Sequence, residues 1–219
     1  MRDQQATDFE IGWLAGIVDG EGWLGLSVSS RPSAANQPVE RLIFARPELR
    51  IGNTDPAIID RAIDILRKIG INPYRRSVMP PGKRRLMHEC SCKHMTGVGT
   101  VLHVIHEQLT GNKQERSSLI LEFIALRQSN PGIENPVYNG GVRGRFGPRR
   151  IRPYTEQELA LVEACRLLQN PGASEATRET QSKAAQELRK YTAKAWAAHD
   201  AESLPAKIWS SPQGDLFGD

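Results

Sequence analysis

Three glycines that recur at every fourth position near the start of the chain constrain its fold more than any other feature. Thr7-x-x-Glu10 has the form of a capping box, and it opens a helix predicted from about Phe9 to Gly20. Gly12, Gly16 and Gly20 would lie on one stripe of this helix. Each glycine inside a helix costs about 1 kcal/mol relative to alanine, so a stripe of them needs a compensating contact. Because only a Cα without a side chain lets another backbone approach closely, we expect a tightly packed partner along this stripe.

The partner of this stripe is expected to be protein. Asp19 and Glu21 at the end of the helix exclude insertion into a membrane, where such stripes are best known. Since the chain holds one such stripe, the simplest partner is the same helix of a second copy across a twofold axis, and a helix crossing within one chain is the alternative. The residues expected at this dimer interface are Gly12, Trp13, Ala15, Gly16 and Asp19.

A twofold axis beside this helix would bring Asp19 and Glu21 close to their own copies. Paired carboxylates repel one another and resist joint ionisation unless a cation lies between them. Hard divalent cations take carboxylate oxygens, and Mg²⁺ sites commonly combine one or two carboxylates with substrate phosphates. Such a pair suits metal-assisted hydrolysis of a phosphodiester, whereas the simpler interpretation is that both residues are ordinary surface acids.

Periodicity beyond this helix predicts an α+β fold. Apolar residues alternate along residues 23–31 and again at the end of a second strand at 49–53, and Asp55-Pro56 opens a helix that ends at Gly70. We therefore expect an antiparallel four-stranded sheet with helices on one face, in the order αββαββα, plus a helical C-terminal extension. The remaining predicted elements are strands at 74–78 and 84–92 and helices at 95–109 and 114–128.

The 219 residues of the chain are expected to form three parts. Residues 1–128 would be the core, and residues 129–153, which lack periodicity and are rich in Gly, Pro, Asn and Arg, would be a linker or an arm that drapes over a partner. In residues 154–219, Thr155-x-x-Glu158 has the form of a capping box that opens a helix, and an alanine-rich helix follows. The sequence assigns this extension no role.

Basic residues gather in two tracts of the chain. Residues 31–93 carry thirteen basic residues against six acidic ones, and residues 139–152 carry five arginines and no acid, although the net charge of the whole chain is only +4. Such clustering is the footprint expected for a phosphate backbone, with an arginine-rich solvated surface as the alternative. On three strands the arginines occupy the parity opposite the core, which predicts a sheet with one apolar and one cationic side.

Cysteine usage and the absence of apolar runs predict a reducing, intracellular location. Cys90, Cys92 and Cys165 are too few and too odd in number for a disulfide framework, and neither a secretory leader nor a membrane-spanning run is present, so no membrane partner is expected. Together with Cys90 and Cys92, His88 and His94 are zinc-ligand residue types. Because alternate residues of a strand lie about 6–7 Å apart, too far to surround one ion, we expect core-facing cysteines instead.

Residues 14–22, Leu-Ala-Gly-Ile-Val-Asp-Gly-Glu-Gly, resemble the signature of the LAGLIDADG homing endonucleases in its common variant that ends Asp-Gly-Glu-Gly. The predicted order of elements resembles that family to about residue 128, with no family pattern beyond it. The resemblance implies central packing of signature helices, a homodimer for a single-signature chain, and a sheet that reads DNA in the major groove. The residues expected to face DNA are Ser27, Ser29, Arg31, Arg46, Arg50, Arg75 and Arg76, joined by Arg143, Arg145, Arg149 and Arg150 of the arm.

The resemblance also implies roles for individual residues. The last acid of the signature, here Glu21, would bind the divalent metal with the carbonyl of Gly20, and Asp19 would brace the helix end as a second-tier site residue. Lys113 matches a family lysine just before a later helix, near the scissile phosphates, and Asn53 matches a polar residue at the end of the second strand that orders water. The alternatives for these two are an exposed helix-start lysine and a turn residue.

The activity that the resemblance implies is site-specific cleavage of double-stranded DNA at a long, roughly palindromic site by a Mg²⁺-dependent homodimer. Mn²⁺ or Ca²⁺ would replace Mg²⁺ in binding, and no small-molecule substrate is expected. The main alternative is a non-cleaving protein of the same fold, an intron maturase or a DNA-binding regulator, and an RNA-binding protein is a more distant one. An intron-encoded protein of this kind would act in the cytoplasm, or in the organelle whose intron encodes it.

The arm gives a first testable prediction. We expect its arginines to follow the DNA backbone or to enter a minor groove, so that each phosphate contact releases counterions. Replacing Arg143, Arg145, Arg149, Arg150 and Arg152 by alanine should flatten the plot of log affinity against log salt concentration, measured by fluorescence anisotropy with a DNA duplex. An unchanged slope would identify the arm as a solubilising linker.

Overall fold

In the computed structural model the first helix, α1 (Asp8–Glu21), begins at the capping box that the sequence predicts. The backbone N–H of Glu10 donates to the Thr7 hydroxyl (3.3 Å), and the backbone N–H of Thr7 donates to the Glu10 carboxylate (2.9 Å). Leu14 and Val18 are fully buried on one side of α1. The helix therefore packs into the core through one face and keeps its glycine stripe outside it.

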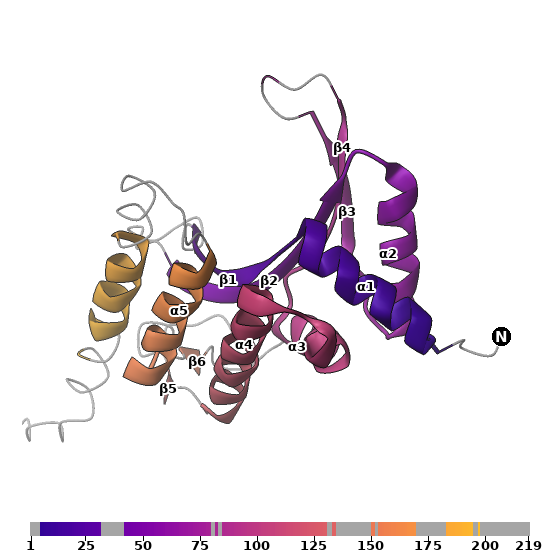
Figure 1. Cartoon of the computed structure of the whole chain (residues 1–219). Coiled ribbons are helices and arrows are strands. Elements are labelled where there is room, and N and C mark those ends of the chain that lie inside the picture. The colour runs from indigo at the N-terminus through magenta and orange to yellow at the C-terminus, as the bar shows by residue number, and fades with distance from the viewer. Residues whose placement is uncertain are drawn as a thin grey trace, which may run out of the picture.

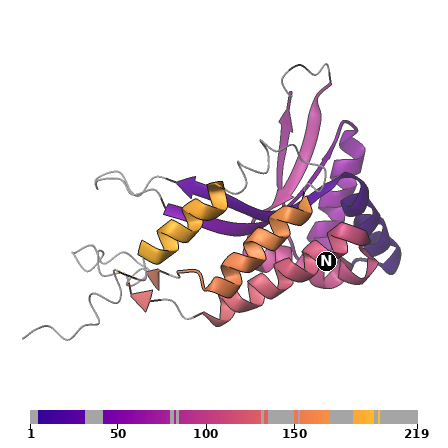
Figure 2. The ribbon, with the colours of Figure 1, turned by 60° about the vertical axis from the view of Figure 1, so that its left-hand side comes forward.

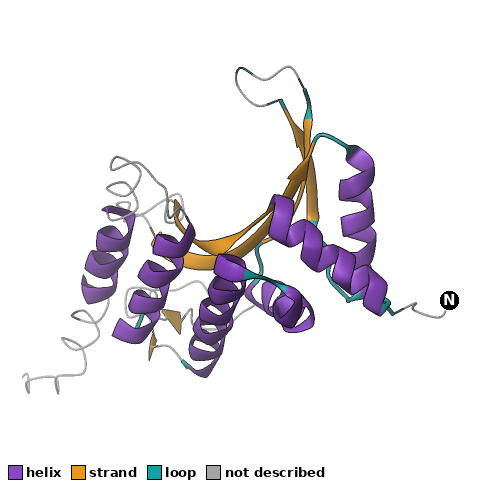
Figure 3. Ribbon diagram, in the orientation of Figure 1, coloured by secondary structure: helices purple, strands orange, loops and turns teal. Residues whose placement is uncertain are grey.

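Four antiparallel strands form the main sheet, in the spatial order β1-β2-β4-β3 (Figure 1). Helices lie on one face of this sheet, so the expected α+β class is confirmed (Figure 3). The strands are β1 (Gly22–Arg31), β2 (Leu42–Asn53), β3 (Tyr74–Val78) and β4 (Met87–Cys92). The helices beside α1 are α2 (Pro56–Lys68), α3 (Met95–Ile105), the short 3₁₀ helix η1 (His106–Gln108) and α4 (Gly111–Ser129).

The structure describes residues 5–31, 42–79, 82, 85–130, 133–134, 150–151, 153–169, 183–194 and 197. The expected loop after residue 31, most of the arm and the ends of the alanine-rich helix lie outside these residues. At the two ends of the arm, β5 (Ile133–Glu134) pairs with β6 (Arg150–Ile151). Among the described helices, none combines the length and the apolar character that a membrane span requires.

The core lies between the sheet and the helices, and strand alternation determines which side chains enter it. Leu24 of β1 and Leu49 of β2, which lie opposite one another, are both buried. Cys90 and Cys92 of β4 are 1% and 4% exposed, which confirms the expectation of core-facing cysteines. Burial raises the pKa of both thiols, that of Cys90 to about 11, so neither is a ready nucleophile.

Strand β2 is paired on both sides over only part of its length. β4 pairs with Leu49–Asn53, whereas β1 pairs with residues 42–51 of β2. Residues 25–31 and 42–48 therefore form a two-stranded ribbon that leaves the four-stranded sheet, here called the β1–β2 ribbon (Figure 2). An isolated two-stranded hairpin is marginally stable in water, so this ribbon needs support from elsewhere in the chain.

The C-terminal extension supplies a further helix, α5 (Glu156–Gln169), which lies beside α4 and against β1 (Figure 2). Its predicted capping box is confirmed, because the Glu158 N–H donates to the Thr155 hydroxyl (3.2 Å) and the Thr155 N–H donates to the Glu158 carboxylate (2.6 Å). Residues 183–194 are helical, within the predicted alanine-rich helix. Apolar side chains of both segments, including Cys165 of α5, join the same hydrophobic core as the sheet.

Some predicted boundaries are wrong, and α4 shows the physical reason. It begins at Gly111 rather than 114 because its N-cap residue, Thr110, is held by Asp19, which lies 91 residues earlier in α1. The Thr110 backbone N–H and hydroxyl both donate to Asp19 Oδ2, at 3.0 and 2.8 Å. Lys113 consequently lies in the first turn of α4 rather than before it. Similarly, β4 begins at Met87 rather than at residue 84.

The contact between Asp19 and Thr110 predicts a structural cost for the loss of Asp19. Asp19→Ala removes the acceptor of both hydrogen bonds at the start of α4, so the free energy of unfolding should fall by about 1 kcal/mol in urea denaturation. Asp64→Ala, which removes an exposed acid 3.6 Å from Arg67, is the control and should change stability little. Equal stability of the two variants would show that Asp19 does not support α4.

Candidate active site and nucleic-acid interface

The acidic end of α1 is placed by a sharp passage from helix to strand. Gly22, the first residue of β1, donates its backbone N–H to the carbonyls of Ile17 and Val18. A Cβ on Gly22 would lie 2.6 Å from the carbonyl oxygen of Val18, so only glycine permits this close approach. Glu21, the last residue of α1, is thereby held directly at the junction, with its side chain exposed.

Lys113 of α4 reaches the same junction. Its Nζ donates to the carbonyl oxygens of Val18 and Asp19, which belong to the last turn of α1. Burial lowers the pKa of Lys113 and neighbouring Arg116 lowers it further, whereas the negative charges of Asp19 and Glu21 oppose that shift. The structure thus brings together three residues that the resemblance selected, Asp19, Glu21 and Lys113, and the amine of Lys113 caps α1.

The oxygens at this junction fit a hard divalent cation. Asp19 Oδ1 is buried and has no hydrogen-bond partner among the described residues, while Gly20 and Glu21 are exposed. Mg²⁺ takes such carboxylate and carbonyl oxygens and usually completes its shell with waters and substrate phosphates. Within the described part of the chain no three His, Cys, Asp or Glu side chains gather as a metal site. One copy therefore offers a partial ligand set.

Asn53 lies near the junction but serves a turn. It stands two residues beyond Ile51, which pairs with Gly22, so it is at the same end of the sheet as the acidic tip of α1. Its Oδ1 accepts a hydrogen bond from the backbone N–H of Asp55 (2.9 Å), and Asp55 in turn caps α2. This is the turn role that the sequence leaves open for Asn53.

The glycine stripe of α1 is open. A Cβ at Gly16 or Gly20 would meet no atom within 4 Å among the described residues, so no described helix of this chain crosses the stripe there. At Gly12 a Cβ would lie 3.4 Å from the side chain of Gln108. Ala15 is different: it is 1% exposed and faces the core, because successive helix residues are rotated by about 100°. Its side chain is therefore not part of the open stripe.

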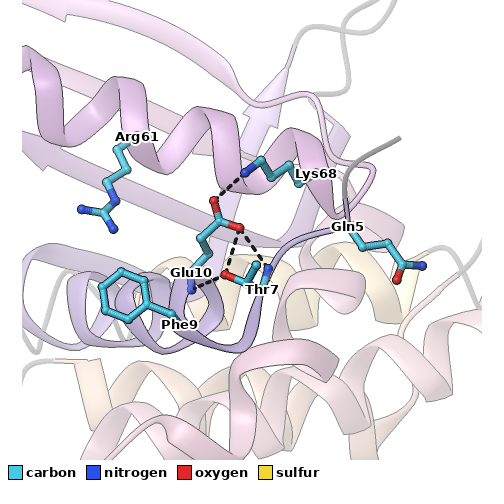
Figure 4. A pocket seen from close by; sticks show the side chains of 6 residues that line it. All are labelled: Gln5, Thr7, Phe9, Glu10, Arg61 and Lys68. Atoms are coloured by element: carbon cyan, nitrogen blue, oxygen red, sulfur yellow. Dashed lines mark hydrogen bonds and ion pairs between the residues drawn. The ribbon is translucent and has the colours of Figure 1, made fainter. Parts of the chain in front are cut away.

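Aromatic side chains continue this stripe toward the start of α1. Phe9 is 73% exposed, and the guanidinium of Arg61 lies 5.6 Å from its ring centroid and 4.5 Å from that of Trp13. A pocket beside them lies at the end of α1 away from Glu21, and Glu10 and Lys68 in its lining form an ion pair (2.5 Å; Figure 4). The pocket is lined by Gln5, Thr7, Phe9, Glu10, Arg61 and Lys68.

On the sheet face opposite the core, Arg50 is held by its neighbours. It lies across from Trp23, with its guanidinium 4.4 Å from the indole ring centroid, and its Nε is 3.3 Å from the Glu48 carboxylate. Lys93 also approaches Glu48, at 3.1 Å. Glu48 is therefore buried between two cations, although its strand parity is that of the open face. This patch therefore carries two positive charges, on Arg50 and Lys93, against the one negative charge of Glu48.

Farther along the β1–β2 ribbon, the open face carries Arg46 and two serines. Ser27 lies opposite Arg46 and donates from its hydroxyl to the Arg46 carbonyl (3.4 Å). The guanidinium of Arg46 lies 5.7 Å from the ring centroid of Phe44, and Ser29, which pairs with Phe44, is half-buried. The predicted parity of these residues is confirmed by the strand register.

Arg75 and Arg76 do not share a face. Arg75 pairs in register with core-facing Cys90, and its guanidinium forms an ion pair with Asp60 of α2, on the helical side of the sheet. Its expected place on the DNA-facing side is therefore wrong, because adjacent strand residues point to opposite faces. Arg76 lies on the open face, where it makes two hydrogen bonds to the Glu89 carboxylate, at 3.1 and 3.0 Å. Its charge is largely balanced there.

Some arginines of the expected DNA interface are not described, or are described only by their backbone. Arg143, Arg145 and Arg149 lie outside the described residues, and only the backbone of Arg31 and Arg150 is described.

Sequence reasoning missed Thr110, Arg116 and Tyr154, which make long-range hydrogen bonds to α1, β1 and β2. No local pattern marks these three residues, because their partners are at least 91 positions away in the chain.

Comparisons with known proteins identify the fold. No family model matches the chain, and no curated protein matches its sequence. The homing endonuclease I-TnaI aligns over 84% of this chain and 99% of its own, with 15% identity and a TM-score of 0.51. An archaeal intron-encoded homing endonuclease, I-Vdi141I complexed with DNA, aligns over 84% and 97%, with 11% identity and a TM-score of 0.51. The homing endonuclease I-CvuI, in complex with the I-CreI target in 2 mM Mg with the DNA not cleaved, covers 82% and 94%, with 16% identity and a TM-score of 0.47.

The alignments with I-TnaI and I-Vdi141I extend beyond residue 128, where the resemblance in the order of predicted elements ends. They cover 84% of the chain, a larger share than residues 1–128 contain. The shared fold therefore includes part of the segment in which the sequence showed no family pattern. The chain has the LAGLIDADG homing endonuclease fold, and its residues 14–22 resemble the signature after which that fold is named.

Proposed function

We propose that this protein is a homodimeric, site-specific endonuclease that hydrolyses both strands of DNA at a long, roughly palindromic site, with Mg²⁺ as its cation. The observation that carries this proposal is the meeting of Asp19, Glu21 and Lys113 at one helix end. That end adjoins a sheet whose open face carries Arg46 and Arg50. Carboxylates beside a phosphate-binding surface are what metal-assisted hydrolysis of a phosphodiester requires.

Each residue at the junction has a distinct task in this proposal. Glu21 and the carbonyl of Gly20 would hold the cation, with Asp19 Oδ1 as a second-tier ligand. When bound, the cation supplies activation of water and stabilisation of the leaving oxygen. Lys113 fixes the last turn of α1, which holds Glu21 in one orientation, and places a positive charge beside the scissile phosphate. Asn53 would order water at the same end of the sheet.

The β1–β2 ribbon is the proposed reader of DNA. A two-stranded ribbon fits the major groove, where arginine grips guanine O6 and N7, although many arginine contacts go to phosphate instead. Arg46 and Arg50 are half-buried on this face, and ring contacts restrict their motion. On β3 and β4 the open face is nearly neutral, with Arg76 paired to Glu89 and with Tyr74 and Val78 exposed. Base recognition there would rest on apolar and hydroxyl contacts.

The open stripe of α1 supports the proposed homodimer. Gly16 and Gly20 lack a neighbour among the described residues, and exposed Phe9 extends the same face with apolar surface. A second copy packed along the stripe would bring a second Glu21 to the junction and give the site twofold symmetry. We also place the protein inside the cell, because all three cysteines are free thiols.

One observation favours the alternative of a non-cleaving protein of the same fold, a maturase or a DNA-binding regulator. Asp19 and Lys113 both hold helix ends, so a pure binder would retain them for stability alone. Glu21 has no such structural contact among the described residues, and its presence is therefore the feature that speaks for cleavage. The two functions differ in the outcome of one substitution.

Glu21→Gln should abolish cleavage and leave binding intact. The carboxylate is exposed at the junction, so its loss should lower the rate of Mg²⁺-dependent cleavage by about 100-fold or more without destabilising the fold. Cleavage would be measured by sequencing the cut ends of a randomised pool of DNA duplexes. Glu107→Gln, at a side chain that is 89% exposed on η1, is the matched control and should cut normally. Retention of specific duplexes without cuts by the wild-type protein would establish the non-cleaving alternative.

Gly16→Ala should separate fold stability from self-association. A Cβ at Gly16 meets nothing within 4 Å, so the isolated chain should gain about 1 kcal/mol from helix propensity, measured by thermal unfolding at low protein concentration. The same methyl group would obstruct the close approach of two α1 helices, so dimers on DNA should weaken in analytical ultracentrifugation. Ser118→Ala, on the exposed side of α4, is the control that leaves association unchanged. Dimers of undiminished affinity in Gly16→Ala would exclude this interface.

A further inference from the structure

The β1–β2 ribbon needs support because, among the described residues, no further strand pairs with its outer edges. In the register of β1 and β2, Val28 lies opposite Ala45 and Leu24 opposite Leu49. In an antiparallel pair, alternate residues direct both backbone N–H and C=O away from the partner strand. On β2, the backbone N–H and C=O of Leu49 that point away from β1 face β4. The pairing of β2 with β4 ends at Leu49, so β4 does not reach Ala45. An unpaired buried amide is costly, so these groups require other partners.

Tyr154 takes the place of the missing strand at Ala45. Its hydroxyl accepts a hydrogen bond from the Ala45 N–H (2.8 Å) and donates one to the Ala45 C=O (3.2 Å), and all of these atoms are buried. Burial raises the pKa of Tyr154, which keeps the hydroxyl protonated as both donor and acceptor. The next residue of the same parity is Pro47, which has no N–H to satisfy.

The opposite edge of the ribbon is bound in a similar way. Arg116 of α4 donates to the carbonyl oxygen of Leu24 (2.8 Å), and the backbone of Leu26 makes a hydrogen bond to Cys165 of α5. Side chains from α4 and from the C-terminal extension thus bond the outer edges of β1 and β2. The extension therefore has a physical contact with the segment that carries Arg46.

The position of Tyr154 is itself set by buried contacts. Its ring is stacked on Phe123 of α4, with 6.2 Å between centroids, and the guanidinium of Arg127 lies 4.4 Å from its ring centroid. Arg127 forms a buried ion pair with Glu158 (3.3 Å) and also donates to the Pro153 carbonyl (3.3 Å). Such a network fixes geometry more than it adds stability, because desolvation offsets most of its attraction.

We propose that Tyr154 is a positioning residue for DNA recognition, which holds the backbone at Ala45 so that the flanking side chains Phe44 and Arg46 meet the duplex in one orientation. This inference rests on the proposed DNA-binding function. Phe44 and Arg46 flank Ala45 and point to the opposite face, so a displacement of the Ala45 backbone moves both of them. Tyr154 itself is buried on the core side, so its effect on DNA recognition would pass through the backbone of Ala45.

The test is Tyr154→Phe, which removes the hydroxyl and keeps the ring stacked on Phe123, so the variant should fold. Tyr191→Phe, at a half-buried tyrosine in the helix of residues 183–194, is the matched control. Hydrogen exchange measured by NMR should show the Ala45 amide exchanging about tenfold faster in Tyr154→Phe and unchanged in the control. Binding is measured with duplexes that the wild-type protein selects from a randomised pool in Ca²⁺.

Two features of the binding data separate positioning from a merely structural role. Tyr154→Phe should bind about tenfold more weakly with an unchanged salt slope, because no phosphate contact is lost. It should also relax specificity at the base pairs that Arg46→Ala relaxes and spare those that Arg50→Ala relaxes. An unchanged Ala45 exchange rate, or faster exchange with wild-type affinity and specificity, overturns the proposal. If the wild-type protein selects no duplex, the DNA-binding function itself fails, and this inference fails with it.

Discussion

The site depends on how tightly the chain turns from α1 into β1 at Gly22. The missing side chain at this position lets the strand begin against the Val18 carbonyl, and the Lys113 amine donates to the Val18 and Asp19 carbonyls of the same helix turn. A side chain at Gly22 would clash with the backbone of Val18, so this turn would have to shift. The same turn leaves the glycine stripe of α1 on the outside, so the geometry that presents the acid also presents the proposed dimer surface.

A second constraint is that the backbone N–H and C=O groups at the outer edges of the β1–β2 ribbon need hydrogen-bond partners. The four-stranded sheet satisfies Leu49 and the residues after it, but the ribbon extends beyond β4. Tyr154, Arg116 and the backbone contact of Cys165 replace strands that the topology does not provide. The C-terminal extension thus shares one hydrophobic core with the β1–β2 ribbon and makes hydrogen bonds to its backbone.

Local features of this protein could be read from its sequence, and contacts between distant segments could not. Both capping boxes, the strand parity of Arg46 and the core-facing cysteines follow from spacing alone, because each depends on residues a few positions apart. The early start of α4 could not be foreseen, since Asp19 of another helix holds its N-cap residue, Thr110. Strand alternation lets only one of Arg75 and Arg76 face DNA, and the packing of α2, whose Asp60 pairs with Arg75, decides which one does not.

The sequence by itself determined the order of elements and the signature of residues 14–22, because periodicity and a nine-residue motif are local properties. It also determined which residues are acidic or basic, but not which of them meet. Only the tertiary structure decided that Lys113 caps α1, that Asn53 serves a turn and that Tyr154 bonds β2. Each of these contacts depends on packing geometry between segments, which the spacing of residues along the chain does not encode.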